Sequence, residues 1–419
     1  MKKKLIRRLK KTKAGAWIIK KIRAHRRDKM CLELSKNAVV KEKQIIFSAF
    51  SGRLYACSPK AIYEYMLNDP KFDDYTFIWA FTKPDQKQHL FHNDRTILVK
   101  YHTKEFFKYL STSKYWIFNF RTPPYFAKRE DQIFVQCWHG TPLKRLAHDI
   151  HVSQDTTFYR SKMSAADMYR TYDIDVARYN YMISPNRFCT EVFQSAFGID
   201  RERLIETGYP RNDCLINATK EDVRKIRDEL GIPADKKIVL YAPTWRDNQY
   251  VAKGYTFHLE ADFRKWKEML GDEYVVMFKP HYLIINEQAD DPSLNGFLYS
   301  IDADKDISSL YLIADILVTD YSSVFFDYSV LKRPIYFYMY DIESYKEELR
   351  GFYIDIYKDL PGQIYEKEET MLSDIANGVY DSEKLSSFNA YFNEHEDGHA
   401  SRRVIDIVFK ERSSWESRS

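Results

Sequence analysis

Short apolar runs that alternate with helix-forming stretches constrain the fold of this chain most strongly. One series of runs lies between residues 45 and 183, and a second lies between residues 237 and 338. Strands alternating with helices are typical of βαβ units, in which helices cover both faces of a parallel sheet. The pattern predicts an α/β protein with two doubly wound, Rossmann-like domains. The expected strands are 45–47, 75–79, 96–99, 115–118, 133–135, 181–183, 237–241, 274–278, 297–299, 316–318 and 335–338.

A polar, helix-forming stretch between the two series predicts a domain junction near residues 215–235. The chain has 419 residues, which is enough for two or three domains. The expected parts are a basic arm over residues 1–35, α/β domains over 36–220 and 221–385, and a C-terminal helical segment over 386–419. No Gly-x-Gly-x-x-Gly or Gly-x-x-x-x-Gly-Lys-Ser/Thr loop occurs, which argues against a dinucleotide oxidoreductase and a P-loop ATPase.

The N-terminal arm differs sharply in charge from the rest of the chain. Residues 1–29 hold 14 Lys or Arg and one acid, Asp28, whereas the remainder carries a net charge of −8. A basic, partly apolar helix with Trp17 fits an anionic membrane surface, where each Lys or Arg contributes about 1 kcal/mol. Nucleic acid attracts the same charges, and a solvated tail is a third interpretation. We expect the membrane surface and no nucleic acid as partner. The longest apolar run of the arm, 14–19, is too short to span a membrane.

The cysteines do not form a recognisable metal or redox motif. There are five, scattered along the chain, so we expect buried thiols in a reducing compartment. No cluster of metal ligands stands out. We therefore expect no bound metal or other cofactor, and a need for a divalent cation stays open.

The segment 314–326 predicts a strand that delivers a helix N-terminus. An apolar run ends in Thr319 and Asp320 and turns through Ser322 and Ser323, one of which is the expected N-cap. Free backbone N–H groups and the helix dipole suit a phosphate. An ordinary capped helix after a core strand is the alternative.

Other polar groups also follow predicted strands. His139 and Gly140 come after 133–135, Arg246 comes after 237–241, and Lys279 and His281 come after 274–278. Because a histidine has an ordinary pKa of about 6.5, His139 could act as a general base. Two cations, a histidine and hydroxyl groups suit a diphosphate and its leaving group. A structural histidine and surface salt bridges are the alternatives for single residues. Two facing histidines would fit a transferase.

An ordered set of motifs resembles the CDP-glycerol glycerophosphotransferase family, the teichoic-acid primases and polymerases of Gram-positive bacteria. The motifs run in the family's order from about residue 45 to residue 405. They are 55–65, 138–144, 186–188, 207–211, 241–246, 279–281, 319–323, 350–353 and 397–401.

The resemblance implies a GT-B-like fold and transfer of glycerol phosphate or ribitol phosphate from a CDP-polyol, with release of CMP. The acceptor would be a hydroxyl of an undecaprenyl-diphosphate-linked molecule, bound by residues 36–220, while residues 221–385 would bind the donor. By resemblance, His139 is the base, and His281 binds or protonates the leaving phosphate. The remaining expected donor-binding residues are Arg246, Lys279, Pro280, Thr319, Asp320, Ser322, Ser323 and Arg350. The expected acceptor-binding residues are Gly140, Thr141 and Lys144.

Several alternatives stay open at this point. Asp320 could hydrogen-bond a ribose or orient a histidine. A GT-B glycosyltransferase using a UDP- or GDP-sugar is the second enzymatic hypothesis, and a polyanion binder acting through the arm is the third. The sequence does not distinguish glycerol from ribitol, and at 419 residues a primase is as consistent as a polymerase. We expect a peripheral protein on the cytoplasmic face of the cell membrane.

Overall fold

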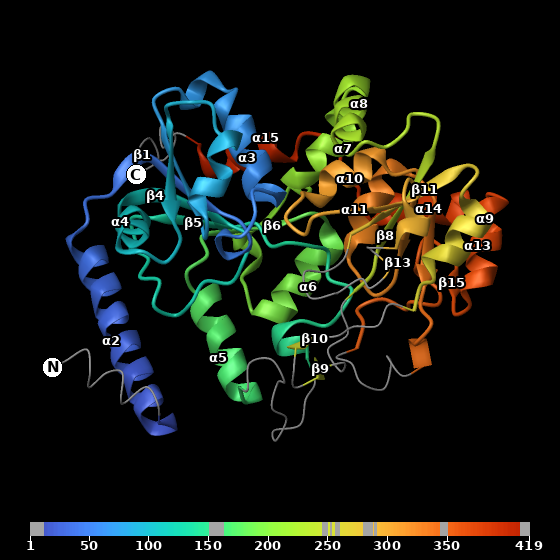
Figure 1. Cartoon of the computed structure of the whole chain (residues 1–419). Helices are drawn as coiled ribbons and strands as arrows, with labels where there is room; N and C mark the ends of the chain where they lie inside the picture. Colours follow the sequence, from blue (N-terminus) through green and yellow to red (C-terminus); the bar gives the residue numbers. More distant parts are fainter. Residues whose placement is uncertain are drawn as a thin grey trace.

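Two parallel β-sheets organise the chain, as Figure 1 shows. The computed structural model describes residues 12–150, 163–244, 250–251, 254–255, 260–279, 288, 291–343 and 351–410. A seven-stranded sheet with its helices forms the first unit, and a six-stranded sheet with its helices forms the second unit. The prediction of an α/β fold with parallel sheets is confirmed.

The first sheet has the strand order β3-β2-β1-β4-β5-β6-β7, and all its pairings are parallel. Ile45 and Phe47 of its central strand pack into one hydrophobic cluster, and Ile46 packs into another on the opposite face. Burial on both faces explains why its strands read as continuous apolar runs. The strands are β1 (Lys41–Ser48), β2 (Thr76–Phe81), β3 (Thr96–Lys100), β4 (Ser113–Phe118), β5 (Ile133–Gln136), β6 (Tyr181–Ser184) and β7 (Leu204–Glu206), and the helices are α3 (Cys57–Leu67), α4 (Lys104–Thr112), α5 (Ala165–Val176) and α6 (Arg187–Phe197).

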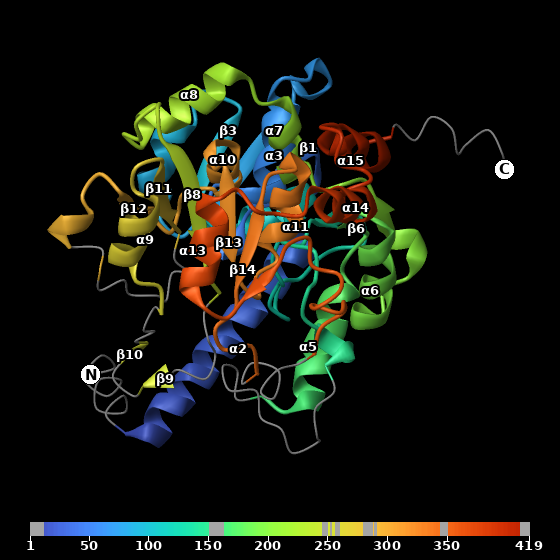
Figure 2. The same cartoon turned by 90° about the vertical axis from the view of Figure 1, so that its right-hand side faces the viewer.

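The second sheet has the order β12-β11-β8-β13-β14-β15 and is also parallel. Figure 2 shows α9 and α13 on one side of it and α11 and α14 on the other. Its strands are β8 (Lys237–Ala242), β11 (Tyr274–Phe278), β12 (Leu298–Ser300), β13 (Ile316–Thr319), β14 (Ile335–Tyr338) and β15 (Ile364–Tyr365), and its helices are α9 (Phe263–Leu270), α10 (Ile307–Ile313), α11 (Val324–Tyr328), α13 (Glu368–Ala376) and α14 (Ser382–Phe392). A separate short hairpin joins β9 (Tyr250–Val251) and β10 (Gly254–Tyr255).

Two connections link the units. Helices α7 (Asp213–Asn217) and α8 (Lys220–Glu229) lie at the predicted junction between β7 and β8. The last described helix, α15 (Ala400–Val408), returns to the first unit and packs on α3, where Val404 and Ile405 join the same cluster as Ile45. The C-terminal segment therefore closes the first unit after the chain has completed the second.

The arm is a helix, α2 (Lys13–Asn37), and only part of it extends from the body (Figure 1). Its C-terminal half is anchored: Cys31 is buried, Arg27 lies 3.4 Å from the Tyr125 ring, and Ser35 accepts a hydrogen bond from Arg129. In the other half, the Trp17 side chain is 57% exposed. Residues 1–11 lie outside the described residues. Among the described helices, none combines the length and apolar character needed to cross a bilayer.

Four cysteines are buried as predicted, but the prediction is wrong for Cys214. This residue belongs to the five-residue helix α7 at the junction, where it lines a surface cavity of about 1100 Å³ beside α3 and α15. A short helix at a junction has no sheet to pack its outer face against, which accounts for the exposure.

Candidate functional site

Loops from both sheets meet at Gly140 and Ser323. Gly140 follows β5 of the first sheet, and Ser323 follows β13 of the second sheet. A Cβ atom added to Gly140 would lie 2.7 Å from Ser323 Oγ, so a larger residue would force the serine side chain or the loops to move. The chain neighbour of Gly140 is His139. The structure thus brings the His139 loop against the turn that contains Ser322 and Ser323.

A second contact between the units involves two of the predicted motifs. The segments 143–145 and 351–353 pair as a short antiparallel bridge. Arg145 N donates to Gly351 O at 3.0 Å, and Tyr353 N donates to Leu143 O at 2.9 Å. Lys144 takes part in this bridge through its backbone, opposite Phe352.

His139 is exposed to solvent, although neighbouring protein atoms partly desolvate its ring. Its Nδ1 atom lies 2.9 Å from the backbone oxygen of Asn119. Because a carbonyl oxygen only accepts, Nδ1 carries the hydrogen in the neutral ring and Nε2 carries the lone pair. Desolvation lowers the pKa of His139 to about 4, with a smaller lowering by the charge of Arg211. The imidazole is therefore neutral at pH 7 and able to accept a proton at Nε2, with a pKa well below the ordinary value expected from the sequence.

The backbone of the His139 loop and of the neighbouring loop is strained. Trp138 has a φ of 49°, and Phe50 and Ser51 in the loop after β1 have φ of 48° and 59°. Such left-handed conformations cost about 1–3 kcal/mol each for residues other than glycine. Asn119 ties the two loops together, because its Oδ1 accepts from Phe50 N at 2.8 Å while its backbone oxygen binds His139.

Thr319 and Asp320 are buried and connect strand ends. Thr319 Oγ1 donates to Ala242 O at 2.8 Å. The Asp320 carboxylate, 2% exposed, accepts from Thr244 N at 2.8 and 3.0 Å. In this structure neither side chain reaches the surface of the site, and both fix the start of the loop that leads to residue 246. The two roles left open for Asp320, a ribose contact and the orientation of a histidine, stay predictions beside this backbone hydrogen bond.

Ser323 is the N-cap residue of α11, but its side chain makes no capping hydrogen bond. Its backbone has φ −71° and ψ 0° instead of the extended conformation usual at this position, and its hydroxyl faces Gly140. The predicted position of the cap is therefore correct, while capping by the serine side chain is not observed. Ser322 is partly buried beside it.

Lys279 lies at the end of β11. Its backbone N donates to Tyr241 O at 3.0 Å, and its ammonium group donates to the backbone oxygen of Asp302. Desolvation lowers the pKa of Lys279 to about 8, an effect that nearby Asp304 and Asp306 partly oppose. The group is mostly protonated at pH 7 and supplies a cation at this sheet edge.

The remaining predicted residues are divided between the interior and the undescribed segments. Thr141 is buried, and its side chain hydrogen-bonds the Cys189 thiol. Arg246, Pro280, His281 and Arg350 lie outside the described residues.

Sequence reasoning assigned no role to Asn119 or Arg211. Arg211 belongs to the motif 207–211, which could have drawn attention to it. Asn119 acts on His139 through its backbone oxygen, which every residue type has, so the sequence does not indicate this role.

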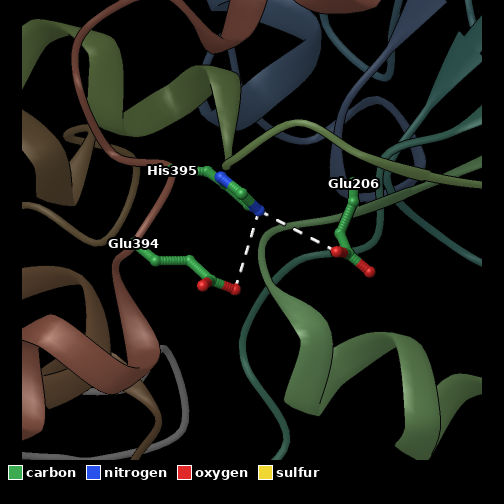
Figure 3. A group of neighbouring side chains, drawn as sticks. All are labelled: Glu206, Glu394 and His395. Carbon is green, nitrogen blue, oxygen red and sulfur yellow. Dashed lines mark ion pairs between the residues drawn. The ribbon is translucent and has the colours of Figure 1, made fainter.

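One group among the described residues has ligand atoms close enough for a metal ion: Glu206, Glu394 and His395, shown in Figure 3. His395 Nε2 lies 3.8 Å from the Glu206 carboxylate and 3.6 Å from that of Glu394. Glu206 also accepts from Thr190 Oγ1 at 2.5 Å and from Arg201 at 3.3 Å. With these partners the group forms an ion-pair network.

Comparison with known proteins places the chain in a family. The family model described as CDP-glycerol:poly(glycerophosphate) glycerophosphotransferase matches residues 30–410. The chain belongs to this family.

Relatives within the glycerophosphotransferase family are similar over most of the chain. A teichoic acid poly(glycerol phosphate) polymerase of Staphylococcus epidermidis is 41% identical over 381 residues, which cover 89% of this chain and 51% of that protein. A polymerase of the same name from Bacillus spizizenii is 40% identical and covers 87% and 91%. A teichoic acid glycerol-phosphate transferase of Staphylococcus aureus is 38% identical and covers 87% and 92%. The chain thus spans about half of the first relative and most of the other two.

Solved structures of a wall teichoic acid polymerase also match most of the chain. The structure of the wall teichoic acid polymerase TagF matches with a TM-score of 0.84 and 39% identity, covering 94% of this chain and 95% of that one. A TagF variant soaked with CDPG matches with a TM-score of 0.83. A UDP-GlcNAc 2-epimerase from Neisseria meningitidis, at 11% identity and a TM-score of 0.51, shares the fold alone.

Proposed function

We propose that this protein transfers glycerol phosphate from CDP-glycerol to a hydroxyl of a lipid-linked acceptor in teichoic acid synthesis and releases CMP. The observation that carries the proposal is the neutral His139 imidazole beside the Ser323 turn, in a chain of the glycerophosphotransferase family. We further propose a GT-B-like arrangement, in which the first unit binds the acceptor and the second unit binds the donor.

The chemistry follows from the geometry of His139. Nε2 accepts the proton of the acceptor hydroxyl, and the oxygen attacks the phosphorus of the glycerol phosphate. The bond between this phosphorus and the oxygen of CMP breaks, and CMP leaves with the electron pair. Lys279 supplies positive charge for the developing phosphate charge, and Arg246 and His281 are proposed to do the same.

Glycerol is favoured over ribitol as the polyol. The relatives named for glycerol phosphate polymers are 38–41% identical to this chain, whereas a poly(ribitol-phosphate) polymerase of Bacillus spizizenii is 30% identical. A glycerol-phosphate primase of Bacillus subtilis is also 30% identical, so the support for CDP-glycerol comes from the polymerases and the glycerol-phosphate transferase among the relatives. An undecaprenyl-diphosphate-linked acceptor is proposed from the family resemblance alone.

We propose that the arm binds the anionic cytoplasmic face of the membrane as a peripheral anchor. The N-terminal half of α2 exposes Trp17, Ile18 and Ile22 next to Lys20 and Lys21. Apolar side chains beside cations are the combination that interfacial helices use.

The direct test measures CMP release from CDP-glycerol, CDP-ribitol, a UDP-sugar and a GDP-sugar with a lipid-linked acceptor. We expect release with CDP-glycerol, and a loss of at least about 100-fold in His139→Ala, because a general base contributes about 10²–10⁴-fold. His148→Ala is the matched control, since His148 belongs to the same unit but pairs with Asp173 at 2.7 Å. Equal acceptor-dependent rates in His139→Ala and wild type would contradict the assignment of the base, and turnover of a UDP-sugar alone would contradict the donor.

A further inference from the structure

A buried ion pair joins the two units beneath the candidate site. Arg211 lies in the short 3-10 helix Pro210–Asn212 after β7, and Asp327 lies in α11 of the second unit. Arg211 Nη2 is 2.8 Å from Asp327 Oδ1, and the side chains are 6% and 9% exposed. Asn212 Nδ2 donates to the same oxygen at 3.2 Å. A buried charge of this kind is tolerated only while its partner is present.

The pair connects the Ser323 turn to the packed interior of the first unit. Helix α11 begins directly after Ser323, whose hydroxyl faces Gly140, and it carries Asp327 at its fourth residue. On the other side, Arg211 Nη1 lies 3.6 Å from Cys57 Sγ at the start of α3, and its guanidinium lies 4.2 Å from the Tyr209 ring. Movement of α11 relative to the first unit would therefore break this pair.

Arg211 is too deeply buried to bind a substrate itself. Its Nε atom has almost no exposed surface and no hydrogen-bond partner among the described residues. It can act only through its neighbours and through its charge. Its positive charge also lowers the pKa of His139, after desolvation and the opposing hydrogen bond of Asn119.

Among the described residues that face Arg211, Asp327 carries the opposite charge. Asn119 faces His139 with a carbonyl oxygen, and Phe50 and Trp138 face it with their rings. Burial keeps Tyr209, Tyr311 and the thiols of Cys137 and Cys189 neutral by raising their pKa, and it raises the pKa of Glu396 to about 8.

We propose that Arg211 is a positioning residue, which through Asp327 holds α11 and the His139 loop in one relative geometry and contributes a fixed positive charge to the site. The inference deepens the proposed function and rests on it, because it takes His139 as the base. It predicts that loss of the Arg211 charge raises the titration midpoint of His139, whereas loss of the Asp327 charge does not raise it.

The test compares Arg211→Met, Arg211→Lys and Asp327→Asn in the full chain. Arg178→Met is the control, because Arg178 pairs with Asp175 at 3.5 Å, is 12% exposed, and lies entirely within the first unit. The first readout is the rate at which diethyl pyrocarbonate modifies His139, followed by mass spectrometry as a function of pH. Only the neutral imidazole reacts, so the midpoint reports its protonation without turnover. The second readout is the rate of CMP release from CDP-glycerol, and circular dichroism verifies folding.

We expect Arg211→Met to move the midpoint upward by about half a pH unit or more, because a neighbouring positive charge is lost. Asp327→Asn should leave it unchanged or move it downward, since the Arg211 charge is then uncompensated. Arg211→Lys should keep the midpoint but lower kcat more than it changes the KM for CDP-glycerol, because one ammonium group cannot reproduce the contacts of the guanidinium fork.

Two results would overturn the inference. One is a modification midpoint of His139 in Arg211→Met that equals the midpoint in Arg178→Met. The other is a kcat in Arg211→Lys that equals the wild-type value. The second result decides the question even if Arg211→Met does not fold. Absence of CMP release by the wild type would contradict the proposed function instead, since the modification midpoint is measured without turnover.

Discussion

At the scale of single residues, the site depends on atoms that carry no sequence signal of their own. The proton on His139 is placed by the backbone oxygen of Asn119, and the approach of the two loops depends on the missing side chain of Gly140. Sequence reasoning selected His139 and Gly140 because both follow a predicted strand. It could not predict that Gly140 contacts Ser323, since this contact depends on how two separate sheets dock.

The first residue-scale prediction concerns Gly140→Ala. The new methyl group would lie 2.7 Å from Ser323 Oγ, so the serine side chain must turn away or the loops must separate, at a cost of up to about 3 kcal/mol. We expect a lower melting temperature and slower CMP release. The double variant Gly140→Ala/Ser323→Gly removes the clashing hydroxyl and should recover the melting temperature. If Ser323→Gly lowers the melting temperature further instead, the close contact between residues 140 and 323 does not cause the destabilisation of Gly140→Ala.

The second prediction concerns the pH dependence of transfer. A base must be neutral, so kcat/KM for the acceptor falls as the pH drops through the pKa of His139 in the free enzyme. With this pKa lowered to about 4, the rate should hold well below pH 6.5, where an ordinary histidine would already be half protonated. A pH–rate profile measured from pH 4.5 to 8 decides this. If kcat/KM falls with a midpoint near pH 6.5, and His139→Gln abolishes this fall, the pKa of His139 is not lowered.

At the scale of elements, apolar runs predicted the strands well because both sheets are buried on both faces. All eleven expected runs correspond to strands; their ends differ by at most two residues, except that β1 begins four residues before the expected run. The strands β7, β9, β10 and β15 were missed because each holds at most two apolar residues in a row. The polar residues after the strands were harder to interpret. Thr319 and Asp320 follow β13 like ligand-binding residues, yet they bind the backbone of the neighbouring strand end.

This backbone contact leads to a prediction for Asp320→Ala. Without the carboxylate, Thr244 N loses its buried acceptor, which costs about 1–3 kcal/mol. Because this contact fixes the loop after β8, we also expect a higher KM for CDP-glycerol. Thermal melting and initial rates test the two effects. Asp315→Ala is the matched control, since Asp315 binds Ile238 N at the opposite end of the same strand, at 2.7 Å. It should lower the melting temperature but leave the KM unchanged.

At the scale of the whole molecule, one half of the helix that forms the basic arm packs on the first unit, and the other half is free. Charge asymmetry alone predicted an arm over residues 1–35, but the helix continues to Asn37, and its second half is packed on the first unit. The contacts of Arg27 with Tyr125 and of Ser35 with Arg129 show where the free part ends. The charge of the sequence predicts attraction to an anionic surface. Only the tertiary contacts show which of the cations in α2 already pack on the protein.

The two halves of α2 should therefore respond differently to the loss of charge. Lys20→Gln/Lys21→Gln/Arg23→Gln removes three exposed cations from the free half, so flotation with anionic vesicles should weaken while the melting temperature stays constant. Arg27→Ala removes a cation that packs on Tyr125, so it should lower the melting temperature more than it weakens flotation. Raising the salt concentration should release the wild type from vesicles and narrow its difference from the triple variant, because screening shortens the reach of these charges. Equal flotation of the wild type and the triple variant at low salt would mean that the free half of α2 is not the anchor.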